Sequence, residues 1–373
     1  MQINYLDKMY LSKLKQFQMR IQKAVLSEKR FLKAEFARSE DPVPFKDRKS
    51  LTYSDISEGG KWGETWDSAW FRLTATVPAE WRGRKAAALL DFNGEGLIFS
   101  NEGVPLQGIT NMSVFAHRFV RDTFIVLEKC KGCEKIELWV ETAANGIFGI
   151  GNILNDINDP DINLEEDGPR RYGYHEGTLN KCRLAIFDEE MFQFSNDFNV
   201  LLDLAESLPE AAVKRAKILR CLNEASNAFK ENPANAPLCR DILKRELSKP
   251  AEASALAAIA VGHAHIDTGW LWPVKETIRK CGRTFSNQIA LIEKYPSYVF
   301  GASQPQHYEF TQKHYPELYK KIKKYVKSGQ WELQGGMWVE ADCNIISGES
   351  MVRQFLYGKN FYMDEFGIDV KNL

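Results

Sequence analysis

The feature that most constrains this chain is a stretch in its second half, residues 261–273, which reads Val-Gly-His-Ala-His-Ile-Asp-Thr-Gly-Trp-Leu-Trp-Pro. It follows a small apolar run, Ala255–Val261, that predicts a buried strand, and it ends at Pro273, a typical first residue of a helix. Residues two apart on an extended chain point to the same side. His265 and Asp267 are therefore predicted to face one metal ion, with His263 aimed alongside, at the strand end where α/β enzymes place their chemistry.

Strand and helix patterns alternate through the rest of this half, which predicts three βα units of a parallel sheet. A parallel sheet normally has more strands and both faces covered, so we expect the N-terminal piece of a longer protein. The predicted strands are Ala255–Val261, Tyr298–Ala302 and Gln330–Gln334, with Ile368–Val370 beginning a fourth, and the predicted helices are Pro273–Tyr295, Gln306–Lys327 with a bend at Pro316, and Ser347–Phe366.

Three further segments precede these units. Apolar and basic residues at helical spacing between Leu6 and Phe36 predict an N-terminal helical segment, residues 1–50. Short β-branched and aromatic runs cut by Gly, Asn and Pro predict an antiparallel β-sandwich over 51–195, and a helical pattern predicts a linker over 196–250. The fold class is thus α/β plus all-β, with residues 251–373 forming the βα units.

Composition excludes several classes of protein. The 49 basic and 50 acidic residues are balanced, which argues against a nucleic-acid or membrane-surface binder. No apolar run approaches the roughly 20 residues of a membrane span, and no signal peptide is evident. Seven scattered cysteines favour a reducing, cytoplasmic setting. The single CxxC, Cys130–Cys133, is predicted to be an incidental hairpin turn, because no second pair follows.

Polar side chains also end the second and third predicted strands: Ser303, Gln304 and Gln306, then Trp338, Glu340, Asp342 and Asn344. Zinc accepts imidazole nitrogen and carboxylate oxygen and takes three or four protein ligands. Only His265 and Asp267 are strong candidates, so at least one ligand is missing. Spacing alone leaves two enzyme classes open, a metal-dependent amidohydrolase and a metal-assisted glycosidase.

The neighbouring residues carry a resemblance. Residues 263–273 resemble the metal-binding signature of glycoside hydrolase family 38, the class II α-mannosidases. Residues 335–344, Gly-Gly-Met-Trp-Val-Glu-Ala-Asp-Cys-Asn, and then Ser347–Ser350 resemble the second conserved segment of that family. Residues Trp66–Phe71 and Asn93–Leu97 resemble the N-terminal domain of its cytosolic-type branch.

The resemblance implies a retaining hydrolase that releases terminal α-linked mannose from oligosaccharides, on an incomplete parallel (β/α)7-type barrel. It implies zinc, with cobalt as an alternative, held in part by His265 and Asp267. Trp270 would stack on the sugar and Asp342 would line the same subsite, while His263 and Glu340 would support the ligands. Relatives of this branch commonly assemble, so a homo-oligomer is possible.

The resemblance also places the nucleophilic aspartate in a segment expected beyond Leu373. No catalytic residue is therefore assigned within this chain, and we expect the chain alone to be inactive and to bind metal weakly. A second interpretation is a non-catalytic carbohydrate-binding or assembly unit built on the sandwich. The aromatic side chains near its start are nevertheless predicted to fill core rather than to stack on sugars; they are Trp62, Trp66, Trp70, Phe71 and Trp81.

Overall fold

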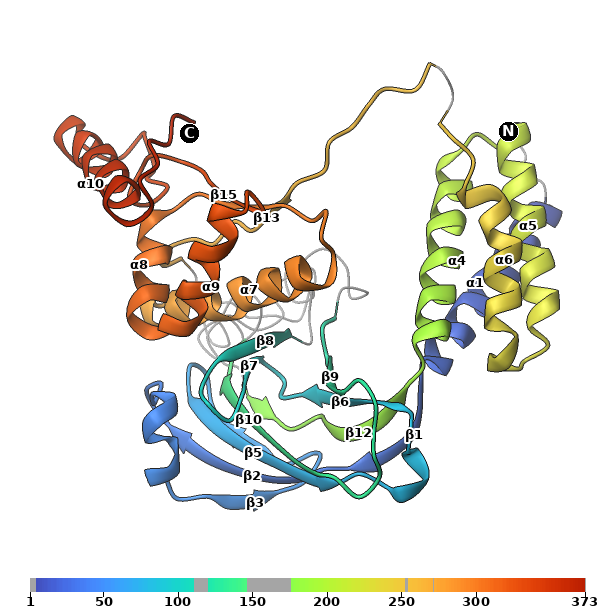
Figure 1. Ribbon diagram of the computed structural model, residues 1–373, viewed down its shortest axis with the longest axis horizontal. Helices are drawn as coiled ribbons and strands as arrows, with labels where there is room; N and C mark the ends of the chain where they lie inside the picture. The colour runs from blue at the N-terminus through green and yellow to red at the C-terminus, as the bar shows by residue number, and fades with distance from the viewer. Residues whose placement is uncertain (1–4, 111–119, 146–175, 252–253, 271, 373) are drawn as a thin grey trace, which may run out of the picture.

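Three structural parts follow one another in the computed structural model, which describes residues 5–110, 120–145, 176–251, 254–270 and 272–372. A β-sandwich lies between a bundle of helices and a small α/β unit (Figure 1). The chain enters through the bundle, passes through the sandwich, returns to the bundle and ends in the α/β unit. This path places segments that are distant in sequence side by side.

The sandwich consists of two antiparallel sheets, as the sequence predicts. Along each strand, successive side chains point alternately to the inner face, which is buried between the sheets, and to the outer face. The four-stranded sheet has the order β1 (Leu26–Phe31), β12 (Lys181–Phe187), β6 (Lys85–Asp91), β9 (Thr123–Leu127). The six-stranded sheet has the order β3 (Ser54–Ile56), β2 (Lys33–Ser39), β5 (Ser68–Thr76), β10 (Lys135–Ala143), β7 (Glu95–Phe99), β8 (Pro105–Thr110). Two short strands, β4 (Lys61–Gly63) and β11 (Gly177–Thr178), pair separately.

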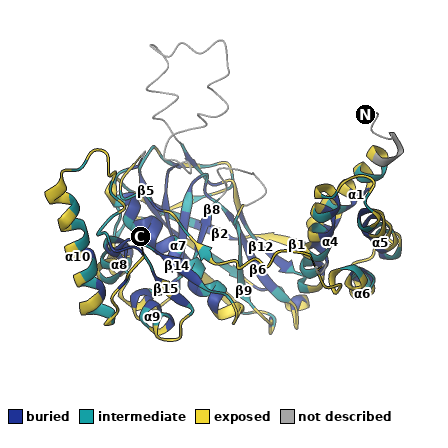
Figure 2. Ribbon diagram, turned by 90° about the horizontal axis from the view of Figure 1, so that it is seen from above, coloured by how far each residue is buried: buried dark blue, intermediate teal, exposed yellow. Residues whose placement is uncertain are grey.

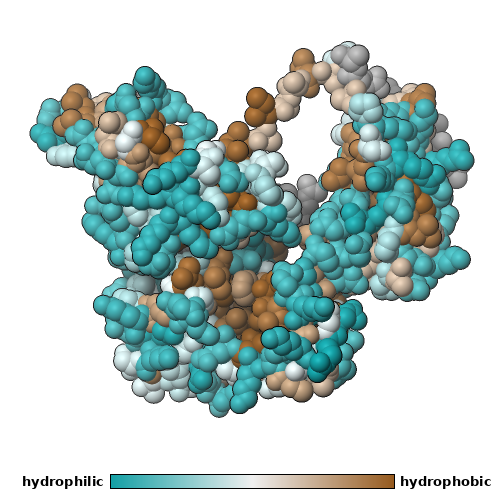
Figure 3. Space-filling model, viewed as in Figure 1, coloured by the Kyte–Doolittle hydropathy of each residue, from teal (hydrophilic) through white to brown (hydrophobic). Residues whose placement is uncertain are grey.

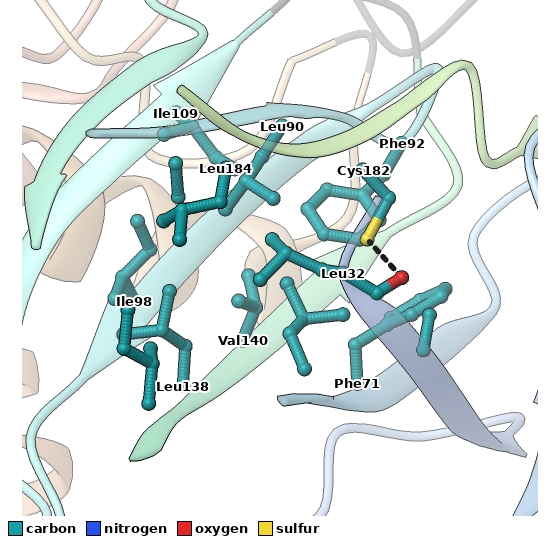
Figure 4. Packing of buried hydrophobic residues seen from close by; sticks show 14 of the residues in the cluster. Leu32, Phe71, Leu90, Phe92, Ile98, Ile109, Leu138, Val140, Cys182 and Leu184 are labelled. Atoms are coloured by element: carbon teal, nitrogen blue, oxygen red, sulfur yellow. Dashed lines mark hydrogen bonds between the residues drawn. The ribbon is translucent and has the colours of Figure 1, made fainter. Parts of the chain in front are cut away.

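The core of the sandwich lies between the two sheets (Figure 4). Phe71 of β5 pairs with Val140 of β10, and both point inward to meet Leu184 of β12. Trp62, Trp81 and Phe71 are buried in this core, and Trp70 is buried against the outer face of the larger sheet. The prediction that aromatic side chains fill core is confirmed for these four, whereas Trp66 is only half-buried at a turn with a positive φ of 70°.

The predicted helical character of residues 1–50 is correct only as far as Ala24. Helix α1 (Tyr5–Ala24) is followed by β1 and β2, so the predicted helical residues Phe31 and Leu32 belong to the sandwich or to the turn between its sheets. Backbone pairing of β2 with β5, from Lys33 opposite Thr74 to Ser39 opposite Ser68, overrides the local helical spacing. The sandwich therefore begins well before residue 51.

Helix α1 and the predicted helical linker form one bundle. Helices α4 (Glu189–Ser207), α5 (Val213–Phe229) and α6 (Ala236–Leu247) pack with α1 around a shared apolar core. The ring of Phe17 lies 5.2–6.2 Å from the rings of Phe194, Phe198 and Phe229. The start of α4 is set by Asp188, whose carboxylate accepts the N–H of Met191 at 3.0 Å. The two segments that looked separate in sequence thus share a single core.

The α/β unit contains a parallel sheet in the order β13 (Gly262–His263), β14 (Phe300–Ala302), β15 (Trp331–Leu333). Its helices are α7 (Val274–Lys294), α8 (Pro305–His314), α9 (Pro316–Lys327) and α10 (Gly348–Phe366). The parallel arrangement and the break at Pro316 agree with the sequence, and Gly367 ends α10 in the left-handed conformation at φ 69°. The (β/α)7-type barrel itself stays a prediction.

Two predicted strands of this unit are not formed. Residues 254–261 run as an exposed extended segment from the bundle to β13, with Leu256 96% and Ile259 93% exposed. In Figure 3 this segment is the thin connection, partly brown, between the bundle and the α/β unit. Residues 368–370 also lack strand pairing, although Val370 is buried. A strand requires a hydrogen-bonded neighbour, and β13 pairs with β14 only at Gly262 and His263.

Helix α7 lies between the parallel sheet of the α/β unit and the larger sheet of the sandwich, and it is buried on both of these sides (Figures 1 and 2). Phe285, Ile289 and Ile292 pack in the core of the α/β unit. On the sandwich side the backbone of β8 comes very close. A Cβ atom on Gly108 would lie 2.7 Å from the Cβ of Arg283, so glycine is required at this crossing. The helix therefore joins the α/β unit to the sandwich.

The seven cysteines are free thiols. The CxxC lies in a turn, as expected, but that turn joins β9 of one sheet to β10 of the other and is not a hairpin. Cys130 is buried and Cys133 is exposed. No described helix is both long enough and apolar enough for a membrane span.

The joint core of α1 and the other bundle helices gives a stability prediction. Phe17 is 1% exposed, so replacing it by alanine leaves a cavity among three aromatic rings. We expect Phe17→Ala to lower the free energy of unfolding of the bundle by about 3–5 kcal/mol, measured by urea unfolding followed by circular dichroism. Met19→Ala on the same helix is the control, since Met19 is 54% exposed, and it is expected to change little. Equal effects of the two substitutions would contradict the shared core.

Candidate functional site

The candidate site is built on the loop between β13 and α7. The loop turns at Gly269, which has a φ of 79°. Its backbone is held by two hydrogen bonds of 3.1 Å, from the Gly269 N–H to the Thr277 hydroxyl and from the Trp270 N–H to the Trp272 carbonyl. The loop conformation thus depends on the first turn of α7.

His265 and Asp267 come together as predicted. Nε2 of His265 lies 3.2 Å from Oδ1 of Asp267. The other ring nitrogen, Nδ1, lies 3.0 Å from Oε2 of Glu340, which follows the third strand of the sheet. A neutral imidazole has one N–H and donates to only one carboxylate at a time. All three side chains remain partly open to solvent.

Nε2 of His265 and Oδ1 of Asp267 are spaced like two of the four ligands of a tetrahedral zinc ion. Two zinc ligands at bond lengths of 2.0–2.2 Å and a tetrahedral angle lie about 3.3 Å apart, close to the spacing of Nε2 and Oδ1. Across the described ranges, however, no three His, Cys, Asp or Glu residues are grouped so that they could hold an ion. His263 is exposed on β13 and does not act as a third ligand in such a group.

Residues that follow β14 support the loop and Glu340. The Ser303 hydroxyl donates to Oε1 of Glu340. The buried side chain of Gln304 accepts the Glu340 N–H at 3.2 Å and donates to the Ile266 carbonyl at 2.8 Å. One glutamine therefore ties together the ends of all three strands. The sequence placed Gln304 at this edge but did not show that it is the link.

His307 is a site residue that the sequence analysis missed. It lies on α8 with Nε2 2.8 Å from the Thr268 hydroxyl, which itself donates to Gln304 at 3.0 Å. Because that hydroxyl proton goes to Gln304, His307 donates to Thr268. Burial, and then the nearby His265, lower the pKa of His307 to about 4, so the ring is neutral at pH 7. The sequence feature that could have identified His307 as a site residue is its position about one helical turn after Gln304.

The two tryptophans of the loop have different environments. Trp270 is 53% exposed, with its ring 5.3 Å from that of Trp272 at 88°. Trp272 is buried, and its indole N–H donates to the Asp267 carbonyl at 3.2 Å and to the Thr277 hydroxyl at 3.1 Å. About half of the Trp270 surface is thus exposed, whereas Trp272 holds the backbone of a candidate ligand.

Asp342 is less closely connected to this group. It is exposed two residues beyond Glu340, and its carboxylate accepts the N–H of Asn344 at 2.9 Å. Its predicted contact with a sugar stays a prediction. The segment before it is held to α10, since the N–H of Trp338 donates to the Gln354 carbonyl at 2.8 Å.

Comparisons with known proteins match most of the chain. Residues 255–373 match the glycosyl hydrolases family 38 N-terminal domain, and residues 30–178 match the alpha-mannosidase jelly roll domain. Alpha-mannosidase G of Dictyostelium discoideum is 33% identical over 329 residues, which is 87% of this chain and 29% of the relative. Alpha-mannosidase 2C1 of Homo sapiens is 31% identical over the same share of this chain and 30% of its own length. The chain thus spans about three tenths of these relatives.

The buried neutral state of His307 predicts a pH dependence. Between pH 6.5, its ordinary pKa, and about 4, the unfolded chain binds a proton that the folded chain does not. The free energy of unfolding therefore falls as the pH drops through this window, by up to about 3 kcal/mol from this residue. Urea unfolding of the native chain and of His307→Gln between pH 7 and 4.5 measures the effect. We expect a flatter profile for the variant; identical slopes would contradict the assignment.

Proposed function

We propose, from the premise that this chain belongs to glycosyl hydrolase family 38, that it forms one side of the mannose subsite of an α-mannosidase. The observation that carries the proposal is the grouping of His265, Asp267 and the exposed Trp270 on a single loop. A pair of metal donors beside a half-exposed aromatic side chain suits a ligand with adjacent hydroxyl groups and an apolar ring face. The proposed substrate is a mannose-containing oligosaccharide with a terminal α-linked mannose.

His265 and Asp267 would supply two ligands to zinc, or to cobalt. Their spacing supports this, since the two donor atoms are separated as in a tetrahedral shell. Such an ion would polarise the sugar hydroxyls and favour the distorted ring of the transition state. The two donors leave the shell incomplete, so further ligands are required from residues outside this pair.

Glu340 would orient His265. Ligating histidines usually donate their second ring N–H to a carboxylate, which fixes the tautomer and raises the basicity of the ligand. The 3.0 Å contact of Nδ1 with Glu340 has this form and leaves Nε2 for the metal. Ser303 and Gln304 in turn hold Glu340. His263 is retained only as a neighbour of this group on β13.

The sugar would lie on Trp270. Its exposed part would give the stacking surface, and its ring stands at 88° to that of Trp272. Asp342 is proposed to line the same subsite from the third strand, through hydrogen bonds to sugar hydroxyls. Hydrolysis would proceed by double displacement, with a nucleophilic carboxylate and an acid/base carboxyl roughly 5 Å apart. Neither group is assigned to a residue of this chain.

The other interpretations have less support. Membership of family 38 removes the reason to propose an amidohydrolase. Stacking on a glycan needs exposed aromatic side chains, and four of the five aromatic residues singled out in the sequence, Trp62, Trp70, Phe71 and Trp81, are buried. An assembly role and a homo-oligomer stay predictions. Free thiols at all seven cysteines support the proposed cytoplasmic location.

The metal proposal is tested by titrating the chain with zinc and with cobalt in a calorimeter. We expect weak saturable binding that His265→Ala abolishes. Glu340→Gln should weaken binding by about 10–100-fold, because it removes the acceptor that fixes the imidazole. Glu349→Gln is the control, since Glu349 is an exposed carboxylate on α10 that pairs with Arg353. Binding that is unchanged by His265→Ala would refute the assignment.

A second test concerns catalysis. We expect the 373-residue chain alone to give no measurable hydrolysis of an aryl α-mannoside, with or without added zinc or cobalt. The reason is that the proposed roles of His265 and Asp267 as metal ligands and of Trp270 as a stacking surface do not include a nucleophile. The assay measures the aryl alcohol that is released from the aryl α-mannoside at neutral pH. Hydrolysis that is lost on chelation and restored by the metal would show that the catalytic groups lie within this chain.

A further inference from the structure

The outer face of the larger sandwich sheet carries two acidic side chains that are largely removed from solvent, Glu141 being buried and the Glu95 side chain 15% exposed. Glu95 of β7 and Glu141 of β10 share this face with Trp70, Leu97 and Trp139, and the side chains are covered rather than solvated. A carboxylate removed from water is costly unless it is paired. The cover over this face therefore has to supply positive charge.

Helix α7 supplies that charge from one of its faces. Arg279 lies 2.6 Å from Glu141, Lys280 lies 2.5 Å from Glu95, and Arg283 lies 2.9 Å from Glu95. Glu276 of the same helix pairs with both arginines. The network thus holds three acidic and three basic side chains. Although burial would raise the pKa of Glu95, Arg283 and Lys280 hold it well below its usual range.

One member of this network reaches the candidate site. Nζ of Lys280 lies 4.6 Å from the ring of Trp272, a cation–π contact, while it pairs with Glu95. The indole N–H of Trp272 donates to the carbonyl of Asp267. Three successive contacts thus connect a side chain of the sandwich with the backbone of a proposed metal ligand.

We propose that the sandwich is a positioning element for the loop that carries His265 and Asp267, and that it acts through Glu95, Lys280 and Trp272. In this arrangement Glu95 fixes the Lys280 ammonium, the ammonium fixes the indole plane, and the indole N–H holds the Asp267 backbone. The metal-binding role of the loop rests on the proposed function, whereas the coupling between sandwich and loop does not. The interaction surface between the two parts is then a component of the site.

The test is hydrogen–deuterium exchange of the metal-free chain, measured by mass spectrometry on peptides that cover residues 264–273. The Gly269 and Trp270 amides are hydrogen-bonded in this loop and report on its conformation. We expect Glu95→Gln and Lys280→Met to speed their exchange by about tenfold or more, because each breaks a charge-assisted contact. Exchange in helices α4–α6 should not change.

Two matched variants separate this coupling from general loosening. Lys280→Arg keeps the charge and the cation–π contact, so it should restore slow exchange. Glu141→Gln changes a buried acidic side chain on the same sheet and at the same helix interface, but the ion pair of Glu141 is with Arg279. It should leave the loop amides slow. Equal loosening by Glu141→Gln and Glu95→Gln would overturn the proposal.

Trp272→Phe provides a measurement that leaves the ion network intact. It keeps an aromatic ring under Lys280 but removes the indole N–H and its bonds to Asp267 and Thr277, so it should speed exchange at the loop amides while the ion pairs of α7 persist. Slow exchange in this variant would also overturn the proposal. Loop loosening in Glu95→Gln together with metal binding unaffected by His265→Ala would refute the proposed metal site and leave the coupling in place.

Discussion

The structure depends on the buried ion network between α7 and the outer face of the sandwich. Removing one partner from such a network leaves an uncompensated charge in a low-dielectric environment, at a cost of about 3–5 kcal/mol. The ion network therefore strongly constrains how α7 packs against the sandwich. Gly108 allows β8 to approach the helix closely. Because α7 also packs on the parallel sheet, one helix sets the position of the α/β unit against the sandwich.

The site combines rigid and open components. Gln304 and Glu340 come from successive parallel strands, whose carboxyl ends meet at one edge, and they hold the loop from the sheet side. Thr277 and Trp272 hold it from the helix side. The groups that face solvent are His265, Asp267 and Trp270. The side chains proposed to touch a ligand are thus exposed. Of the side chains that fix their positions, Gln304, Thr277 and Trp272 are buried, and Glu340 is partly exposed.

Sequence reasoning was reliable where local pattern and tertiary environment agree. The parallel order of β13–β15 and the sandwich strands follow from their periodicity and turn residues. It was wrong at residues 26–39, where pairing with β5 and β12 outweighs helical spacing. It was wrong again at Ala255–Val261, because an apolar run becomes a strand only where a neighbouring strand accepts its backbone hydrogen bonds.

The sequence by itself determined the pairing of His265 with Asp267, since residues two apart at the end of a strand face the same side. It also placed Glu340 and Gln304 at the same edge of the sheet. Only the tertiary structure decided the role of Glu276, Arg279, Lys280 and Arg283. Charged residues at this helical spacing normally indicate a solvated face, and a helix carries no local mark that a second sheet will cover it. Complementary carboxylates about 140–185 residues earlier in the chain are what make burial of this face possible.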